Sequence, residues 1–152
     1  EGQLNRVMQF IDAGKGEAEL VTGGKRLTDG NLSKGFFIAP TIFDRVPTQA
    51  SIAQEEIFGP VLTVHTFKDE EEASELANST VYGLAGAVWT NDIAKAMRVA
   101  KKVKSGMVWV NTFGKLFPAG EMGGYKQSGI GRQYGLEGLW EYTEMKHINV
   151  QL

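Results

Sequence analysis

The chain has 152 residues, 42% hydrophobic and 22% charged, a composition typical of a globular protein that is long enough to bury a core. A net charge of −2 gives no reason to expect nucleic acid or an anionic membrane as partner, and no apolar run is long enough to span a bilayer. The absence of cysteine excludes disulfides and thiolate metal sites within these residues. His65 and His147 have no ligand-spaced partner, so no metal site is expected.

The first third of the chain combines short predicted elements with a polar loop. Apolar side chains recur at helical spacing from the N-terminus, and Gly14 is expected to end this helix as a left-handed cap. Residues 18–21 form a short predicted strand, and residues 24–35 form a surface loop. Residues 36–43 are apolar and favour a strand, in which Pro40 indicates an edge position or a break.

A stiff turn follows, in which residues 54–61 have the sequence Gln-Glu-Glu-Ile-Phe-Gly-Pro-Val. Gly59 tolerates unusual backbone angles and Pro60 fixes its own φ, so the turn can aim Glu56 and Phe58 at one partner. A carboxylate that accepts hydrogen bonds from a diol, beside a ring that packs on a flat heterocycle, would form a nucleoside clamp. The residues alone leave open a simpler interpretation, a surface acidic pair and a core phenylalanine leading into a strand.

Strands and helices alternate from residue 61 onward. Strands are predicted at residues 61–67, 84–90 and 107–111. Asp69, with Glu72 three residues later, is expected to cap the first intervening helix, and Asn91 or Asp92 the second. This βαβαβ order predicts an α/β fold with a parallel sheet, right-handed crossovers and flanking helices. A ligand would bind beyond the carboxyl ends of its strands.

A glycine-rich segment follows, where residues 123–132 have the sequence Gly-Gly-Tyr-Lys-Gln-Ser-Gly-Ile-Gly-Arg. It lacks the Gly-Lys pair of a phosphate-binding P-loop, and Tyr134 stands where a dinucleotide fingerprint needs its third glycine. We therefore favour a structural role, in which the glycines let the segment pass close to neighbouring backbone. Lys126 and Arg132 are expected to tie it down.

Four motifs together resemble the C-terminal part of the catalytic domain of the NAD(P)-dependent aldehyde dehydrogenases. That family carries, in this order, E-E-I-F-G-P-V, V-W-V-N, G-G-Y-K-x-S-G-x-G-R and Y-T-E-x-K. The matching residues are 55–61, 108–111, 123–132 and 142–146. The resemblance covers essentially the whole chain. It implies that residues 1–140 are the C-terminal part of the catalytic domain and that residues 141–152 hold a C-terminal oligomerisation strand.

The resemblance also implies roles for individual residues. Glu56 matches the glutamate that hydrogen-bonds the hydroxyls of the nicotinamide ribose, and Phe58 matches the aromatic residue near the nicotinamide. Asn111 matches an asparagine near the substrate pocket that has a supporting role. Three further residues fall in the stretch that lines the substrate funnel of the family, namely Phe113, Leu116 and Met122. The catalytic thiolate, the general-base glutamate and the oxyanion asparagine have no counterpart, so no catalytic residue is expected here.

The activity that the resemblance implies is oxidation of an aldehyde to a carboxylate with NAD or NADP, through a cysteine thiohemiacetal and thioester. The chain has no cysteine and begins at Glu1 inside a predicted helix. We therefore expect a fragment, inactive alone, of a cytoplasmic homodimer or homotetramer. Betaine aldehyde is one candidate substrate. Members that oxidise it often carry Trp where Phe113 stands, and a Phe ring attracts a cation less strongly than Trp.

Two alternatives remain open from the sequence. The chain could be a non-catalytic assembly module, because apolar and polar residues alternate over residues 147–152 and predict a one-faced strand. Such a strand adds readily to the sheet of another subunit. The other alternative is a free-standing α/β binding domain.

Overall fold

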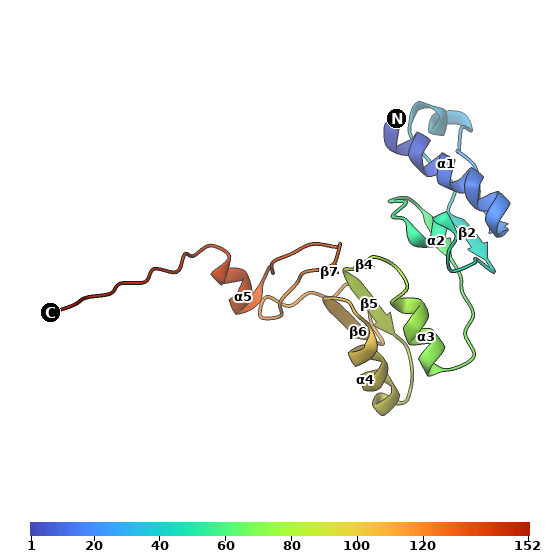
Figure 1. Cartoon of the computed structure of the whole chain (residues 1–152). Helices are drawn as coiled ribbons and strands as arrows, with labels where there is room; N and C mark the ends of the chain where they lie inside the picture. Colours follow the sequence, from blue (N-terminus) through green and yellow to red (C-terminus); the bar gives the residue numbers. More distant parts are fainter. The chain divides into compact units, whose positions relative to one another are not determined.

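The computed structural model describes residues 1–152, which form two compact units, Glu1–Thr80 and Val81–Leu152 (Figure 1). The first unit contains α1 (Gly2–Glu17), β1 (Glu19–Thr22), the 3-10 helix η1 (Gly30–Lys34), β2 (Thr41–Asp44), α2 (Ser51–Gln54), β3 (Val61–Thr63) and α3 (Glu70–Ala77). The second contains β4 (Tyr82–Gly83), β5 (Ala85–Val88), α4 (Ile93–Lys102), β6 (Met107–Val110), β7 (Tyr125–Lys126) and α5 (Gly135–Trp140). No helix is both long and apolar enough to cross a lipid bilayer.

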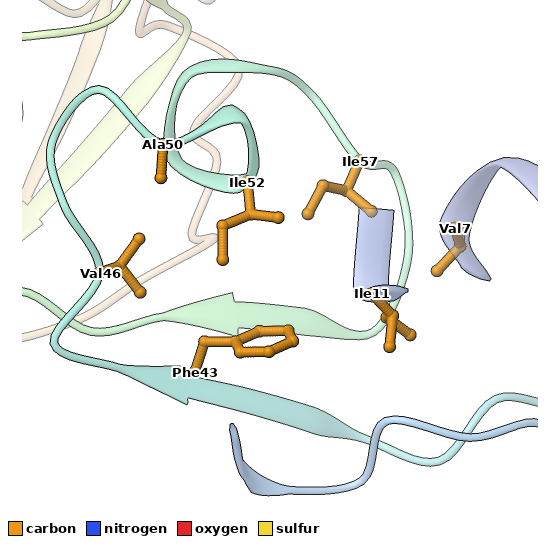
Figure 2. Packing of buried hydrophobic residues seen from close by; sticks show 7 residues of the cluster. All are labelled: Val7, Ile11, Phe43, Val46, Ala50, Ile52 and Ile57. Carbon is orange, nitrogen blue, oxygen red and sulfur yellow. The ribbon is translucent and has the colours of Figure 1, made fainter. Parts of the chain in front are cut away.

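The first unit is built on a three-stranded sheet in the order β1-β2-β3, packed against α1 and α2. β2 is central, antiparallel to β1 and parallel to β3, with Thr41 opposite Val61 and Phe43 opposite Thr63. Figure 2 shows the Phe43 side chain directed from β2 toward Ile52 of α2. The buried cluster around it consists of Val7, Ile11, Phe43, Val46, Ala50, Ile52 and Ile57.

Gly14 does not end the first helix, contrary to the prediction. The helix continues to Glu17, and Ala18 is the extended residue that follows it. Gly14 is buried, and a Cβ there would lie 2.9 Å from Phe43 Cζ and 3.1 Å from Ile52 Cδ1. The glycine is therefore needed for close packing of α1 on the core, a long-range contact that sequence spacing does not reveal.

The apolar segment 36–43 forms a strand only beyond Pro40, from Thr41 onward. Before the proline, the chain makes an isolated bridge between Arg26 and Ile38. Pro40 was predicted to mark an edge or a break, and the break is confirmed. The strand predicted for residues 61–67 is also shorter and ends at Thr63.

The helices α3 and α4 begin where the sequence predicts. Asp69 caps α3 by accepting a hydrogen bond from the Glu72 backbone N–H at 2.9 Å. Asp92 caps α4 in the same way, accepting from the Lys95 N–H at 3.0 Å. Both are local contacts three residues apart, which is why the sequence was sufficient to place them.

The predicted α/β fold with parallel strands is confirmed. β5, α4 and β6 form a βαβ unit whose strands are parallel, with Ala85 opposite Met107 and Val88 opposite Val110. In the first unit, β3 is paired in parallel with β2. The pairing extends past the strand ends, because Thr41 N–H donates to Pro60 O at 2.9 Å. Periodicity identifies a strand but not its partner, so the pairing of β3 with β2 was not predicted.

The end of the chain has no regular secondary structure after α5 and its following turn (Figure 1). Ile148 and Val150 are 76% and 73% exposed. The alternating segment pairs with no strand of this chain, and its role in oligomer contacts stays a prediction.

Candidate functional site

The turn between α2 and β3 presents Glu56 and Phe58 to the surface. Ile57 lies between them and is buried in the core, so its two neighbours are turned outward. Phe58 is 77% exposed and adopts a left-handed backbone with φ of 55°. At Gly59, a Cβ would come within 2.6 Å of Val7 Cγ2, so only glycine lets the turn lie this close to α1.

Side chains from α1 hold the backbone of this turn. The Gln3 amide Nε2 donates to Ile57 O at 3.1 Å and to Phe58 O at 3.0 Å. Arg6 Nη2 donates to Glu56 O at 2.9 Å. The carboxylate of Glu56 makes no hydrogen bond or ion pair within the chain and is exposed. An acceptor group and an aromatic ring, two residues apart, are thus both exposed on a turn whose backbone is held by α1.

The predicted substrate-side residues lie on the second unit, beginning where β6 ends. Asn111 adopts a left-handed φ of 53°, and its N–H donates to Val88 O at 2.8 Å. Its side chain binds the backbone of Thr90, which follows the neighbouring strand β5. Both residues lie at the carboxyl ends of parallel strands, where open sheets bind ligands.

An aromatic pair lies beside Asn111. The rings of Trp109 and Phe113 have centroids 5.0 Å apart with planes inclined at 59°. The Trp109 indole Nε1 donates to Lys115 O at 2.8 Å and so shapes the loop that follows. Phe113 is 65% exposed and Leu116 is also exposed. Asn111, Phe113 and Leu116 therefore share one loop.

Met122 lies in a different place from these three residues. Its backbone pairs with Gln133 through two hydrogen bonds of 2.7 Å. It lines a cavity of about 620 Å³ that Asn111, Phe113 and Leu116 do not line. The other lining residues are Leu84, which precedes β5, and residues of the glycine-rich segment, of α5 and of the chain next to them. These are Gly123, Gly124, Ser128, Gly129, Ile130, Gly131, Arg132, Gln133, Tyr134, Gly138, Glu141 and Tyr142.

The glycine-rich segment has the close backbone packing that was predicted for it. A Cβ on Gly106 would fall on the carbonyl oxygen of Gly123, and one on Gly123 would lie 2.6 Å from Gly131 O. Arg132 Nη1 donates to Gly124 O at 3.2 Å and to Gly131 O at 2.7 Å. These contacts account for the glycines and Arg132 as structural features.

Three contacting residues were missed by the sequence analysis. Gln3 and Arg6 donate to carbonyls fifty or more positions away, and no local signal identifies such partners. Trp109 was given no role of its own, although it lies in the V-W-V-N motif. Its position two residues before Asn111, at the end of a strand, was the available signal.

The fold defines an α/β protein that combines a mixed sheet with a parallel βαβ unit. A model of the aldehyde dehydrogenase family matches residues 1–148. The chain therefore belongs to the aldehyde dehydrogenase family. The sequence-based recognition of this family, which rested on four motifs, is confirmed.

Individual relatives support the same assignment. The betaine aldehyde dehydrogenase of Bacillus subtilis (strain 168) is 54% identical over 144 residues, which cover 94% of this chain and 29% of the relative. Two crystal structures of betaine aldehyde dehydrogenase from Staphylococcus aureus in complex with NAD+ match with a TM-score of 0.94 and 49% identity. Each match covers 99% of this chain and 31% of the solved one. The chain thus spans less than a third of the length of these relatives.

Proposed function

We propose that this chain forms the nicotinamide-side part of the cofactor site, and part of the substrate entrance, of an NAD+-dependent aldehyde dehydrogenase. The observation that carries the proposal is the exposure of both the Glu56 carboxylate and the Phe58 ring, two residues apart on one turn. The cysteine that the reaction requires is not among these residues. A longer protein carrying this segment supplies it.

The residues of the turn fit a nicotinamide nucleoside. A carboxylate without an internal partner can accept charge-assisted hydrogen bonds from both ribose hydroxyls. Phe58 offers an open face against which the flat nicotinamide ring can pack. When bound, NAD+ supplies the hydride acceptor. Glu56 and Phe58 orient the nicotinamide ring. The proposal names NAD+ and not NADP+ because the solved relatives hold NAD+.

The proposed substrate is an aldehyde with a trimethylammonium group. The relatives named betaine aldehyde dehydrogenase support it through 54% and 49% identity. Phe113 also supports it, because its exposed ring faces solvent beside Trp109 and an aromatic face attracts a quaternary ammonium. Asn111, Leu116 and Met122 are proposed as further residues of the substrate side.

A second role is proposed for the end of the chain. The exposed alternation of Ile148, Val150 and Leu152 favours a strand that completes its hydrogen bonds on another subunit. Residues 141–152 would then be the oligomerisation segment and residues 1–140 the catalytic-domain part, in a cytoplasmic homodimer or homotetramer.

The test of the cofactor role is Glu56→Gln in the full-length protein, with Glu55→Gln as the matched control. Loss of charge-assisted hydrogen bonds should weaken NAD+ binding by about 1.5–3 kcal/mol. Calorimetric NAD+ affinity and steady-state kinetics would measure it. Glu55 is an adjacent exposed carboxylate, and its variant should bind NAD+ normally. Unchanged NAD+ affinity and turnover in Glu56→Gln would refute the proposal.

A further inference from the structure

The turn that carries Glu56 and Phe58 is held from one side by a single helix. Three consecutive carbonyl oxygens, those of residues 56–58, all accept hydrogen bonds from α1 side chains. Gln3 supplies two of these bonds and Arg6 the third. Each bond fixes the peptide plane next to an outward-facing side chain, so it constrains where that side chain can point.

The bonds act at a position that needs external support. Phe58 has φ of 55°, a left-handed conformation that is unfavourable for a residue with a β-carbon. Its own carbonyl is the one that Gln3 Nε2 binds at 3.0 Å. A residue keeps such a conformation only when its surroundings determine it. The helix therefore holds the Phe58 ring in an orientation that the isolated turn would not keep.

Arg6 is itself ordered before it reaches the turn. Its guanidinium carbon lies 4.9 Å from the centroid of the Phe10 ring, one helical turn further along α1. The cation–π contact limits the rotamers of a long side chain. Arg6 Nη2 then meets Glu56 O at 2.9 Å with little additional loss of side-chain entropy.

From these contacts we propose that Gln3 and Arg6 are positioning residues for nicotinamide binding, acting through the backbone of Glu56 and Phe58. Neither side chain needs to touch the cofactor. The inference rests on the proposed function of Glu56 and Phe58 and adds that the N-terminal helix sets the geometry of both. Its consequence is that cofactor affinity depends on two residues that sequence motifs do not mark.

The experiment compares Arg6→Ala and Gln3→Ala with the unaltered full-length enzyme. Each should raise the KM and the calorimetric Kd for NAD+ about three- to tenfold, the effect of losing one or two ordinary hydrogen bonds. The KM for the aldehyde and the Tm should change little. Arg6→Lys keeps a donor at the end of a long side chain and should restore much of the affinity. Lys15→Ala removes a charge from the same helix, where Lys15 only contacts Asp12, and should bind NAD+ normally.

A double-mutant cycle separates positioning from general stabilisation. If Arg6 acts through Glu56, then Arg6→Ala should weaken NAD+ binding less in a Glu56→Gln background than in the unaltered enzyme. Additive effects, or unchanged NAD+ affinity in both alanine variants while Glu56→Gln weakens binding, would overturn the positioning role and leave the proposed function standing. Unchanged affinity in Glu56→Gln would instead remove the proposed function itself. Should either alanine variant fail to fold, Arg6→Met and Gln3→Glu remove the donors while keeping a side chain of similar length, and they carry the same comparison.

Discussion

The side-chain amide of Asn111 binds both backbone polar groups of Thr90. Asn111 Oδ1 accepts from the Thr90 N–H at 2.8 Å, and Nδ2 donates to Thr90 O at 2.9 Å. Through these bonds, the pairing between β5 and β6 is continued beyond Val88 and Val110. The amide thus takes the place of one more pair of backbone hydrogen bonds at the carboxyl ends of the two strands. The loop that carries Phe113 and Leu116 begins there.

Asn111→Ala should destabilise the protein and disturb the substrate side together. The variant loses two hydrogen bonds, which should lower the free energy of unfolding by about 1–2 kcal/mol, because exposed hydrogen bonds contribute less to stability than buried ones. A residue with φ of 53° also tolerates alanine poorly. Asn111→Gly also removes the amide but adds no backbone strain, so its Tm should lie between those of the unaltered protein and Asn111→Ala. Thermal unfolding and the KM for the aldehyde would measure both effects, and an unchanged KM in Asn111→Ala would contradict the substrate-side assignment.

Phe113→Leu should weaken the recognition of a cationic aldehyde selectively. Betaine aldehyde can be compared with 3,3-dimethylbutanal, in which a neutral tert-butyl group replaces the trimethylammonium. Loss of one cation–π face should cost the cationic substrate about 0.5–2 kcal/mol in kcat/KM and leave the neutral one nearly unaffected. Phe113→Trp should instead raise the ratio of kcat/KM for betaine aldehyde to kcat/KM for the neutral aldehyde. Equal losses for the two aldehydes would argue against a trimethylammonium substrate.

Local signals in the sequence predicted the helices better than the strands. The caps at Asp69 and Asp92 depend on bonds three residues away, and both were placed correctly. The partner of β3 and the role of Gly14 depend on contacts dozens of residues away. Because a strand pattern carries no information on its neighbour, the pairing of β2 with β3 was not predicted, although the individual strands were largely found.

Gly106→Ala should be strongly destabilising, in contrast to Gly16→Ala. A Cβ on Gly106 would occupy the position of Gly123 O, so the backbone must move, at a cost of about 1–3 kcal/mol. Gly16 lies in α1 with nothing within 4 Å of its added Cβ. Alanine there should stabilise the helix by about 0.5–1 kcal/mol. Denaturant unfolding would compare the two, and a neutral Gly106→Ala would show that the segment 123–132 is not packed as described.

The candidate site was predictable to a similar extent. Motifs placed Glu56 and Phe58 on one stiff turn, and the structure displays both side chains in solvent. The supports were not predictable, because Gln3 and Arg6 bind backbone atoms, which carry no sequence identity. Met122 was grouped with Phe113 because the resemblance to the family places both in the stretch that lines the substrate funnel, and in the structure Met122 lines a cavity that Phe113 does not.

The stabilisation that the charged Asp92 provides should change with pH only in acid. The hydrogen bond from the Lys95 N–H, helped by that of Ala94 and the charges of Arg98 and Lys95, lowers the pKa of Asp92 below its ordinary value of 3.8. A carboxylate whose pKa is lowered by folding stabilises the folded state at any pH above its unfolded-state pKa. This contribution to the free energy of unfolding is lost as the pH falls through the folded-state pKa. Asp92→Asn keeps a capping oxygen but removes the charge. The Tm difference between the two proteins should therefore be constant from about pH 8 to 5 and shrink only below about pH 4. A difference that already fades between pH 7 and 5 would contradict the shift.

The last prediction concerns the exposed end of the chain. If residues 147–152 add a strand to another subunit, Val150→Pro should reduce oligomerisation because proline removes a ladder donor. Ile148→Lys should act on the apolar face, whereas Asn149→Lys changes the opposite, polar face and should assemble normally. Sedimentation of the full-length protein would measure the oligomer, and the KM for NAD+ should stay unchanged wherever the oligomer is retained. An unchanged oligomer in both Val150→Pro and Ile148→Lys would show that assembly does not use this strand.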